Sequence, residues 1–357
     1  MKQTPISESG DFPDYHINIA QGNFYYEDRT PTHAKFQKEH FMKKLIVGFD
    51  GFVDIMVRPV KEKGDTTQYF DTIGNFGRYI TGQEGKSCSI EMDISIRKHG
   101  GNAPLLSTAA SRLGMDVTCI GMMGYPTLDP VFEHLPFEKI SYMPPGESTA
   151  LEFNDGKVFF APGISATDPW GKVTEAMQGK ISFNDADAIA LVNWSEISFA
   201  KELWQNVLDA LTEKKDRHVL FDLCDTTRKP TEDVDEILEL MGAFTAKASV
   251  TLSLNENECL DIGRKIFDNH DAKQIAKLLQ DKYGITEVIV HATKWSYMLA
   301  QDAEVFANTI YVEKPAISTG AGDNFNGSYI VARSQGLDPQ QCIAFCHRFV
   351  HDYISGK

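Results

Sequence analysis

A glycine-rich segment near the carboxyl end carries the residue types that phosphate chemistry requires. Residues 317–327 read Ile-Ser-Thr-Gly-Ala-Gly-Asp-Asn-Phe-Asn-Gly, so small residues from Ser318 to Gly322 precede one carboxylate, Asp323. A glycine-rich turn that opens a helix directs backbone N–H groups toward one point, which suits a phosphate or a developing oxyanion. A carboxylate among those amides suits a base that takes the proton from a hydroxyl attacking phosphorus. An ordinary tight turn with a capping aspartate is the alternative interpretation.

A second glycine motif lies far upstream, in His99-Gly-Gly-Asn-Ala-Pro104, directly before a segment with a helical pattern. Paired glycines at Gly100 and Gly101 let a substrate approach the backbone closely, and the Asn102 amide offers both a donor and an acceptor to a hydroxyl. We therefore predict that this turn contacts the substrate. A plain loop-to-helix turn capped by Asn102 is the alternative.

Two carboxylates, Asp50 and Asp54, follow the buried strand that is predicted over 44–49. A carboxylate beyond the carboxyl end of a strand can accept hydrogen bonds from two sugar hydroxyls at once, so Asp54 is a candidate substrate ligand. A metal site made by Asp50 and Asp54 alone is a weaker interpretation, because no third ligand is evident.

Two further polar segments follow predicted strands in the second half of the chain. Asn255 and Glu258 lie three residues apart. Amide and carboxylate oxygens bind Mg²⁺ largely through water, although the same spacing is common where Asn caps a helix and Glu favours its dipole. Arg228 follows the strand predicted at 218–221.

Both glycine motifs resemble the signatures of a known family, the PfkB (ribokinase-like) sugar and nucleoside kinases. The segment 318–327 is similar to the second signature, D-T-x-G-A-G-D-x-F-x-x-G, and the segment 100–114 is similar to the first, G-G-x-x-x-N…A…L-G. The chain departs from these patterns at Ile317, where the family has Asp, and at Leu105, where it has Asn.

The resemblance implies a role for each segment. Asp323 is then the catalytic base, and the anion hole is formed by the amides of Gly320, Ala321 and Gly322. The substrate is held by Asp54, Gly100, Gly101 and Asn102. The family's N-x-x-E motif, matched by Asn255 and Glu258, places Mg²⁺ there. Contacts to the nucleotide, ATP, are assigned to Asn255, Thr319, Arg228 and Thr293.

The largest departure from the family's sequence pattern lies in the segment that contacts the nucleotide in that family. Where the family has T-x-G-x-x-G, this chain has His291-Ala-Thr-Lys-Trp-Ser296, and both glycines are absent. Thr293 or Lys294 can still reach a phosphate, although an exposed loop is the favoured interpretation of each. His291 is interpreted as a packed residue at the end of a strand rather than as a ligand.

Strand and helix patterns alternate through the second half of the chain, which predicts a mostly parallel sheet with helices on both faces. Strands are predicted at 44–49, 117–121, 188–192, 218–221, 248–254 and 287–291, and helices at 103–113, 200–211, 270–283, 322–335 and 338–354. A hairpin is predicted over 151–160. A further strand, Thr309–Val312, is expected to lead into the glycine turn.

The resemblance implies a ribokinase-like three-layer α/β/α sandwich with a mostly parallel central sheet and a small β lid. Residues 1–43 are expected to be an N-terminal extension, and residues 44–357 to be the kinase domain. Parts of about 55–98 and 140–163 are expected to form the lid. Lid strands of this family often pair between subunits, so a homodimer through the lid is expected.

Composition excludes several classes of partner. The net charge of −15 and the pI near 5.1 argue against nucleic acid and against an anionic membrane surface. Six scattered cysteines without a CxxC pair argue against structural zinc and fit reduced thiols. The polar start of the chain lacks an apolar signal core, and no run of 18 apolar residues occurs, so a cytoplasmic location is expected.

These observations predict an ATP-dependent kinase that transfers the γ-phosphoryl group to a hydroxyl of a sugar. Asp323 is its base, and Mg²⁺ bridges the phosphates. Two alternatives stay open: a nucleoside (adenosine-like) kinase, and a non-catalytic ligand-binding relative with the same fold.

Overall fold

The computed structural model describes residues 17–18, 23–24, 43–317 and 319–357. Most of the predicted extension over 1–43, and Ser318 of the glycine turn, lie outside the described residues. Two short strands, β1 (Ile17–Asn18) and β2 (Asn23–Phe24), pair antiparallel with each other.

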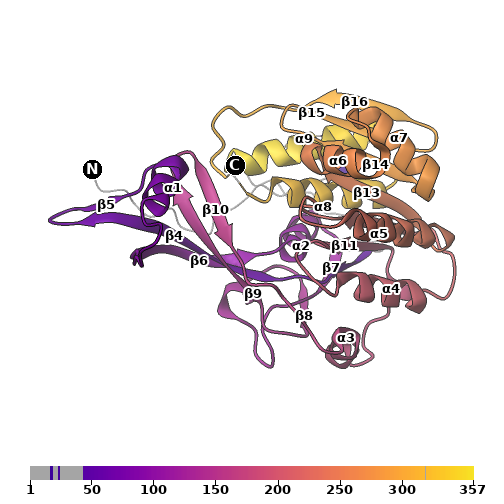
Figure 1. The fold of residues 1–357 in the computed structure, drawn as a ribbon. Helices are drawn as coiled ribbons and strands as arrows, with labels where there is room; N and C mark the ends of the chain where they lie inside the picture. Colours follow the sequence, from indigo (N-terminus) through magenta and orange to yellow (C-terminus); the bar gives the residue numbers. More distant parts are fainter. Residues whose placement is uncertain (1–16, 19–22, 25–42, 318) are drawn as a thin grey trace, which may run out of the picture.

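A nine-stranded sheet forms the centre of the molecule (Figure 1). Its order is β16-β15-β14-β13-β12-β11-β3-β7-β8; neighbours are parallel from β14 to β8, and β15 and β16 are antiparallel. The strands are β3 (Lys44–Gly48), β7 (Asp116–Gly121), β8 (Glu138–Ser141), β11 (Ala188–Val192), β12 (His218–Asp222), β13 (Ser249–Asn255), β14 (Glu287–His291), β15 (Trp295–Leu299) and β16 (Glu304–Asn308). Parallel strands end at one edge of a sheet, so the polar segments that follow β3, β11, β12 and β13 gather at that edge.

Helices cover both faces of this sheet and divide the core in two. One face packs against α3 (Pro169–Met177), α4 (Ala200–Ala210), α5 (Thr231–Ala243), α6 (Glu256–Ile262) and α7 (Ala272–Tyr283). The other face packs against α2 (Asn102–Arg112), α8 (Ala321–Ser334) and α9 (Pro339–Ile354). Short 3₁₀ segments are η1 (Pro130–Phe132), η2 (Phe183–Asp185) and η3 (Phe244–Ala246), and α6 continues into a π-helical segment, η4 (Gly263–Phe267).

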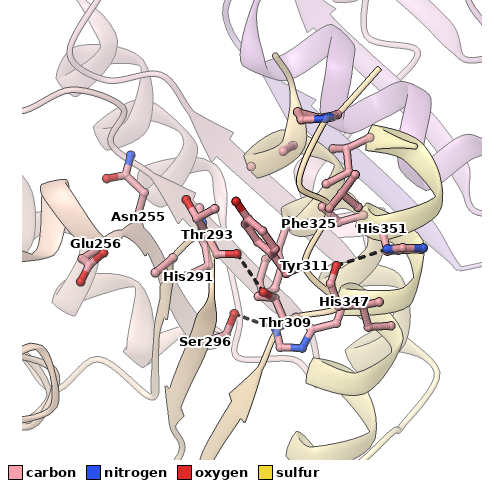
Figure 2. Close-up of a pocket in the computed structure, with 18 of the residues that line it drawn as sticks. Asn255, Glu256, His291, Thr293, Ser296, Thr309, Tyr311, Phe325, His347 and His351 are labelled. Atoms are coloured by element: carbon pink, nitrogen blue, oxygen red, sulfur yellow. Dashed lines mark hydrogen bonds between the residues drawn. The ribbon is translucent and has the colours of Figure 1, made fainter. Parts of the chain in front are cut away.

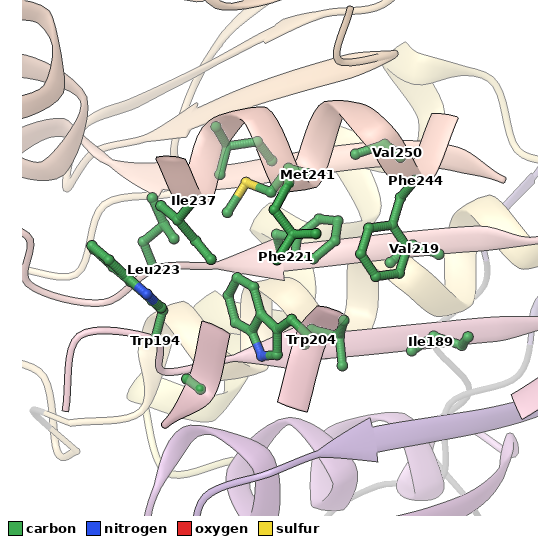
Figure 3. Close-up of a cluster of buried hydrophobic side chains, with 14 of the residues drawn as sticks. Ile189, Trp194, Trp204, Val219, Phe221, Leu223, Ile237, Met241, Phe244 and Val250 are labelled. Atoms are coloured by element: carbon green, nitrogen blue, oxygen red, sulfur yellow. The ribbon is translucent and has the colours of Figure 1, made fainter. Parts of the chain in front are cut away.

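The sequence of the inner strands explains the two helical layers. All five residues of β11 are apolar and buried, which is the pattern of a parallel strand that is covered on both faces. Figure 3 shows part of the first core, where the Trp204 ring of α4 lies 5.1 Å from the Phe221 ring of β12. Phe244 packs edge-on against the same Phe221 ring, also at 5.1 Å between centroids. The aromatic rings thus fill the space between helix and sheet.

A second, five-stranded sheet projects from the large one (Figure 1). Its order is β10-β9-β4-β5, with β6 paired to β4. The elements are β4 (Phe52–Lys63), β5 (Thr67–Tyr69), β6 (Met92–Gly100), β9 (Gly146–Phe153), β10 (Gly156–Phe160) and α1 (Ile73–Thr81). Phe76 of α1 packs between Phe70 and Phe153, at 5.2 and 5.4 Å between ring centroids, which holds the helix on this sheet. These strands come from the segments in which a lid was predicted.

The structure confirms the three-layer arrangement and the hairpin at β9–β10, and it corrects two local predictions. Thr309–Val312 is not a strand, because β16 ends at Asn308. Asp54 does not lie just beyond a strand end: the chain turns over residues 49–51 after β3, and Asp54 is the third residue of β4. The helix α5 was not predicted. In the part of the chain that the structure describes, no helix has both the length and the apolar character needed to cross a bilayer.

Candidate active site

Asp323 lies in the first turn of α8, directly after a left-handed glycine. Gly320 is the N-cap, with φ of +81°. This conformation costs a residue with a side chain about 1–2 kcal/mol, so glycine is favoured there. The Tyr353 hydroxyl donates to the Thr319 carbonyl at 2.9 Å and fixes the turn from α9. The first amides of α8 have no partner within the helix, so the turn has the donors that an anion requires.

The surroundings of Asp323 make it more basic than an ordinary carboxylate. Burial raises its pKa well above the usual value, and the carboxylates of Asp222, Asp50 and Glu258 raise it further. Because negative neighbours disfavour the charged form, Asp323 gains affinity for a proton. A base with a raised pKa is suited to accept the proton of an attacking hydroxyl.

Two contacts fix the position of α8. The Asn326 amide donates to Asp222 at 2.6 Å and accepts from the Ser253 hydroxyl at 2.6 Å, so it joins α8 to β12 and β13. Gly327 lies where α8 meets α2: a Cβ there would be 2.8 Å from the Ala109 Cβ and 2.9 Å from the Leu106 carbonyl oxygen. The final glycine of the motif therefore permits close approach of the two helices.

Asp50, which was not among the predicted site residues, organises the turn before α2. It is fully buried, and it accepts hydrogen bonds from the Asn102 amide (2.7 Å), the Ala103 amide (2.6 Å) and the Asn193 side chain (2.7 Å). Burial raises the pKa of Asp50 to about 6. Gly101, with φ of +95°, is required because a Cβ would lie 2.8 Å from the Asp50 carboxylate. The signal that could have identified Asp50 in the sequence is an acidic residue between a buried strand and glycine-rich turns.

This arrangement limits which groups the backbone of the Gly-Gly-Asn turn can bind. The backbone N–H groups of Asn102 and Ala103 already bind Asp50, so the anion site at the start of α2 is filled by the protein itself. Asn102 is the first residue of the helix, and Gly101 is its N-cap. The alternative interpretation, in which Asn102 caps this helix, is therefore wrong.

Asp54 lies beside the same turn, on β4. Its carboxylate accepts from the Ser148 hydroxyl of β9 at 2.5 Å. A Cβ on Gly100 would lie 2.6 Å from a carboxylate oxygen of Asp54, so Gly100 gives that carboxylate its space. The substrate residues that the sequence proposed, Asp54 and the Gly-Gly-Asn turn, thus lie together where the small sheet joins the large one.

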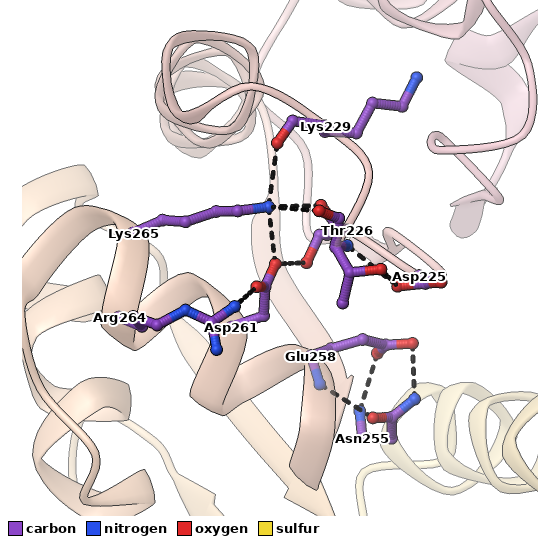
Figure 4. A network of polar contacts seen from close by, with 9 residues as sticks. Asp225, Thr226, Lys229, Asn255, Glu258, Asp261, Arg264 and Lys265 are labelled. Atoms are coloured by element: carbon purple, nitrogen blue, oxygen red, sulfur yellow. Dashed lines mark hydrogen bonds and ion pairs between the residues drawn. The ribbon is translucent and has the colours of Figure 1, made fainter.

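Asn255 and Glu258 form a capping box at the start of α6 (Figure 4). Both oxygens of Glu258 accept from Asn255, one from its backbone at 2.9 Å and one from its side chain at 2.6 Å. Burial, followed by the charges of Asp222 and Asp225, raises the pKa of Glu258 to about 8. The helix-start interpretation of this motif is therefore confirmed.

The donor set is compatible with a magnesium ion. Among the described residues, no cluster of three or more His, Cys, Asp or Glu side chains is arranged to hold a metal by itself. Mg²⁺ at phosphate sites is commonly bound by one or two carboxylates, water and phosphate oxygens, so a complete protein cage is not required. The charge of Asp222 contributes to the raised pKa of Glu258, so the two carboxylates form an excess of negative charge that a cation would offset.

The loop after β12 is held by a buried ion pair (Figure 4). The Lys265 ammonium contacts Asp261 at 2.9 Å and donates to the carbonyls of Thr226 (2.6 Å) and Lys229 (2.9 Å). Arg228, on the same loop, pairs with Glu196 at 2.6 Å, and its side chain is 71% exposed. Arg228 is therefore directed to the surface, where it is paired with a carboxylate, and its contact with the nucleotide stays a prediction.

A cavity of about 500 Å³ opens beside the Asp323 turn (Figure 2). It reaches from Asn255 of β13 and Gly322 of α8 to Tyr311 and His351. Its lining includes the predicted Thr293, whose carbonyl accepts from the Thr309 hydroxyl at 2.8 Å. Thr319 does not line it. The cavity thus joins the glycine turn before Asp323 to a partly aromatic compartment of a size that suits a nucleotide.

Three histidines line this cavity: His291, His347 and His351. The His347 ring is bonded to the Ser296 hydroxyl at 2.8 Å, and burial lowers its pKa. His291 stacks obliquely on Phe325, at 5.0 Å between ring centroids. Burial, with a smaller contribution from His347, lowers the pKa of His291 to about 4, so the ring is neutral at pH 7.

Comparison with known proteins assigns the fold. The family described as prokaryotic ketohexokinase matches residues 31–354. Solved structures with the same fold include an adenosine kinase from Sinorhizobium meliloti (15% identity, TM-score 0.61, 88% of this chain and 94% of that one). They also include an Arabidopsis thaliana ribokinase complexed with ribose and ATP (16%, 0.57, 88% and 92%). A putative ribokinase II from E. coli in complex with ATP and Mg²⁺ is similar to the same degree (15%, 0.59, 88% and 93%).

A search of curated proteins found no significant match. The fold is ribokinase-like, as the glycine motifs predicted, and the family model covers the large sheet, the small sheet and every candidate site residue. The chain belongs to the prokaryotic ketohexokinase family, within the ribokinase-like (PfkB) group of sugar and nucleoside kinases.

Proposed function

We propose that the protein transfers the γ-phosphoryl group of ATP to a hydroxyl of a sugar. The observation that carries this proposal is the position of Asp323. It lies at the N-terminus of α8, where backbone amides converge, and its pKa is raised by burial and by neighbouring carboxylates. The combination suits phosphoryl transfer, in which a base receives the acceptor proton while amides stabilise the charge on the transferred group.

The acceptor lies next to the small sheet in this proposal. Leu105 of α2 lies 3.5 Å from a Cβ built on Gly320, and Gly327 meets Ala109, so α2 and α8 have their N-termini at the same end. The Asp54 carboxylate lies beside Gly100, two residues before α2, and is therefore near the end of α2 that adjoins the start of α8. Asp54 and the Asn102 side chain bind acceptor hydroxyls, and Asp323 removes the proton of the hydroxyl that attacks.

The nucleotide lies in the 500 Å³ cavity, with its phosphates at Gly322. The amides of Gly320, Ala321 and Gly322 stabilise charge on the transferred group, and Glu258 holds Mg²⁺ through water. When bound there, Mg²⁺ would supply positive charge against the phosphates. The complexes of two neighbours with ATP, one of them also with Mg²⁺, support this assignment.

The small sheet acts as a lid. Its β4 carries Asp54 and runs straight on from the turn after β3, so a movement of this sheet carries Asp54 with it. Closure over the acceptor excludes water, which otherwise competes for the phosphoryl group.

A sugar is favoured over a nucleoside as the acceptor because the family that matches is one of ketohexokinases. The start of α2 also supports a neutral acceptor, since Asp50 occupies the amides that an acceptor phosphate would need. The adenosine kinase among the structural neighbours keeps a nucleoside acceptor as the alternative.

The test is ATP-dependent phosphorylation with Mg²⁺ across a panel of ketohexoses, aldoses and nucleosides, measured as ADP release and by detection of the phosphorylated product. We expect turnover on at least one ketohexose and a loss of about 10²–10⁴-fold in kcat for Asp323→Asn. Turnover on nucleosides only supports the alternative. No turnover on any acceptor, with no ATP binding, overturns the kinase assignment, and a fully active Asp323→Asn enzyme overturns the assignment of the base.

A further inference from the structure

His291 occupies the boundary between the anion-binding turn and the rest of the cavity. Its ring atom Cε1 lies 3.5 Å from the position of a Cβ on Gly322, the last glycine before Asp323. It is also the register partner of Asn255 in the neighbouring strand β13. His291 thus lies between the two segments, Gly320–Gly322 and Asn255–Glu258, that we assign to the phosphates and to Mg²⁺.

The His291 ring packs against a neighbouring aromatic ring, but its nitrogen atoms form no hydrogen bond with the described residues of the protein. Phe325 of α8 supports one side of it, at 5.0 Å between centroids and 32° between planes. Ser296, directly opposite on β15, directs its hydroxyl to His347 instead. Within residues 43–317 and 319–357, no hydrogen bond joins the His291 ring to another protein group, and the ring lines the cavity (Figure 2).

We propose that His291 is a phosphate-binding residue of the nucleotide site, where its ring N–H donates a hydrogen bond to a phosphate oxygen of the bound nucleotide. The inference rests on the proposed function, because it assumes that the nucleotide lies in this cavity. A neutral imidazole carries one N–H donor, which is the group that a phosphate oxygen accepts. His291 is the first residue of the segment 291–296, in which the family's glycines are absent. Its side chain therefore supplies a phosphate contact that the family pattern does not contain.

The position of His291 favours a phosphate over the nucleotide base. Its neighbours that line the cavity include Gly322 and Asn255, which belong to the two segments assigned to the phosphates and to Mg²⁺. A base would be recognised where rings can stack on it. Phe325 covers the ring of His291 on one side, which leaves its edge to face the anion-binding turn.

The test compares ligands that differ only in phosphates. Binding of ADP with Mg²⁺ is measured directly, and adenosine is measured by its displacement of a fluorescent ADP analogue, so that both values report the same cavity. For His291→Ala we expect ADP affinity to fall on the order of tenfold to a hundredfold, with adenosine affinity within about twofold of wild type. His291→Gln keeps a donor and should recover part of the lost ADP affinity.

The matched control is His351→Gln, which changes a histidine that lines the same cavity but bonds the Ile310 carbonyl at 3.2 Å. It should leave the ratio of ADP to adenosine affinity unchanged. Unfolding midpoints of all variants check that each remains folded. An equal loss of ADP and adenosine affinity in His291→Ala, or no loss of either, overturns the proposed contact between His291 and phosphate. Neither result bears on the proposed function. Absence of ADP binding to the wild-type protein overturns the proposed function as well.

Discussion

Gly327 offers a sharp test of the idea that helix spacing sets the catalytic geometry. Replacing it with alanine puts a Cβ 2.8 Å from the Ala109 Cβ and 2.9 Å from the Leu106 carbonyl oxygen. Apolar carbons prefer a separation of about 3.5–4.0 Å, so α8 must move away from α2 by roughly 1 Å. Gly327 is one helical turn beyond Asp323, and the movement is therefore transmitted to Asp323, the proposed base.

The expected change in the free energy of unfolding follows from two opposing effects. Overpacking costs about 1–3 kcal/mol, and alanine returns about 1 kcal/mol of helix propensity, so Gly327→Ala should lower the free energy of unfolding by roughly 0–2 kcal/mol. Catalysis is more sensitive, because a misplacement of about 1 Å can reduce the rate on the order of a hundredfold. We expect urea unfolding to show the small loss and kcat/KM in the ADP-release assay to show the large one.

A control separates spacing from the substitution itself. Gly77 also lies within a helix, α1, but nothing lies within 4 Å of a Cβ built there. Gly77→Ala should stabilise the protein by up to about 1 kcal/mol and leave kcat/KM near wild type. The double variant Gly327→Ala, Ala109→Gly relieves one of the two short contacts and should recover part of the activity. Wild-type kcat/KM and stability in Gly327→Ala would refute the reasoning.

Three further outcomes test other parts of the site. Asp50→Asn removes a negative charge that raises the pKa of Asp323, so the acid limb of kcat/KM against pH should move to lower pH; a shift to higher pH would contradict this. Gly320→Ala places a side chain at φ of +81° and 2.8 Å from the Tyr353 hydroxyl, so urea unfolding should show a loss of about 1–2 kcal/mol, and an unchanged midpoint would argue against the turn as described. Ile94 of β6 is 66% exposed, and Met92 and Ile96 on the same strand are also exposed. If the protein forms a dimer through this strand, Ile94→Asp should be monomeric by light scattering. A monomeric wild type would rule the dimer out.

The candidate base and its turn could be predicted from sequence because their chemistry is local. A glycine-rich turn, a carboxylate and a following helix are neighbours in the chain, so their mutual position depends on a few backbone angles, such as the positive φ of Gly320. The same holds for Asn255 and Glu258, whose spacing of three residues is that of a capping box.

Asp50 and His291 show what local patterns miss. Asp50 binds the Asn102 and Ala103 amides, more than 50 residues away in the chain, and Asn193, which is farther still. His291 was interpreted as packing because a single histidine at the end of a strand gives no sign of what faces it. Its position beside Gly322 follows from the packing of α8 on the sheet.

The sequence by itself determined the alternation of elements and the glycine-rich turn with its carboxylate at the start of a helix, because these depend on periodicity and on short-range backbone geometry. Only the tertiary structure decided that Asp50 fills the start of α2, that Arg228 is directed to Glu196, and that His291 faces the cavity. The physical reason is that burial and charge at the edge of the sheet are produced by segments that are distant in the chain. Asp222, Asp50 and Glu258 raise the proton affinity of Asp323 only after the parallel strands have brought them to one edge.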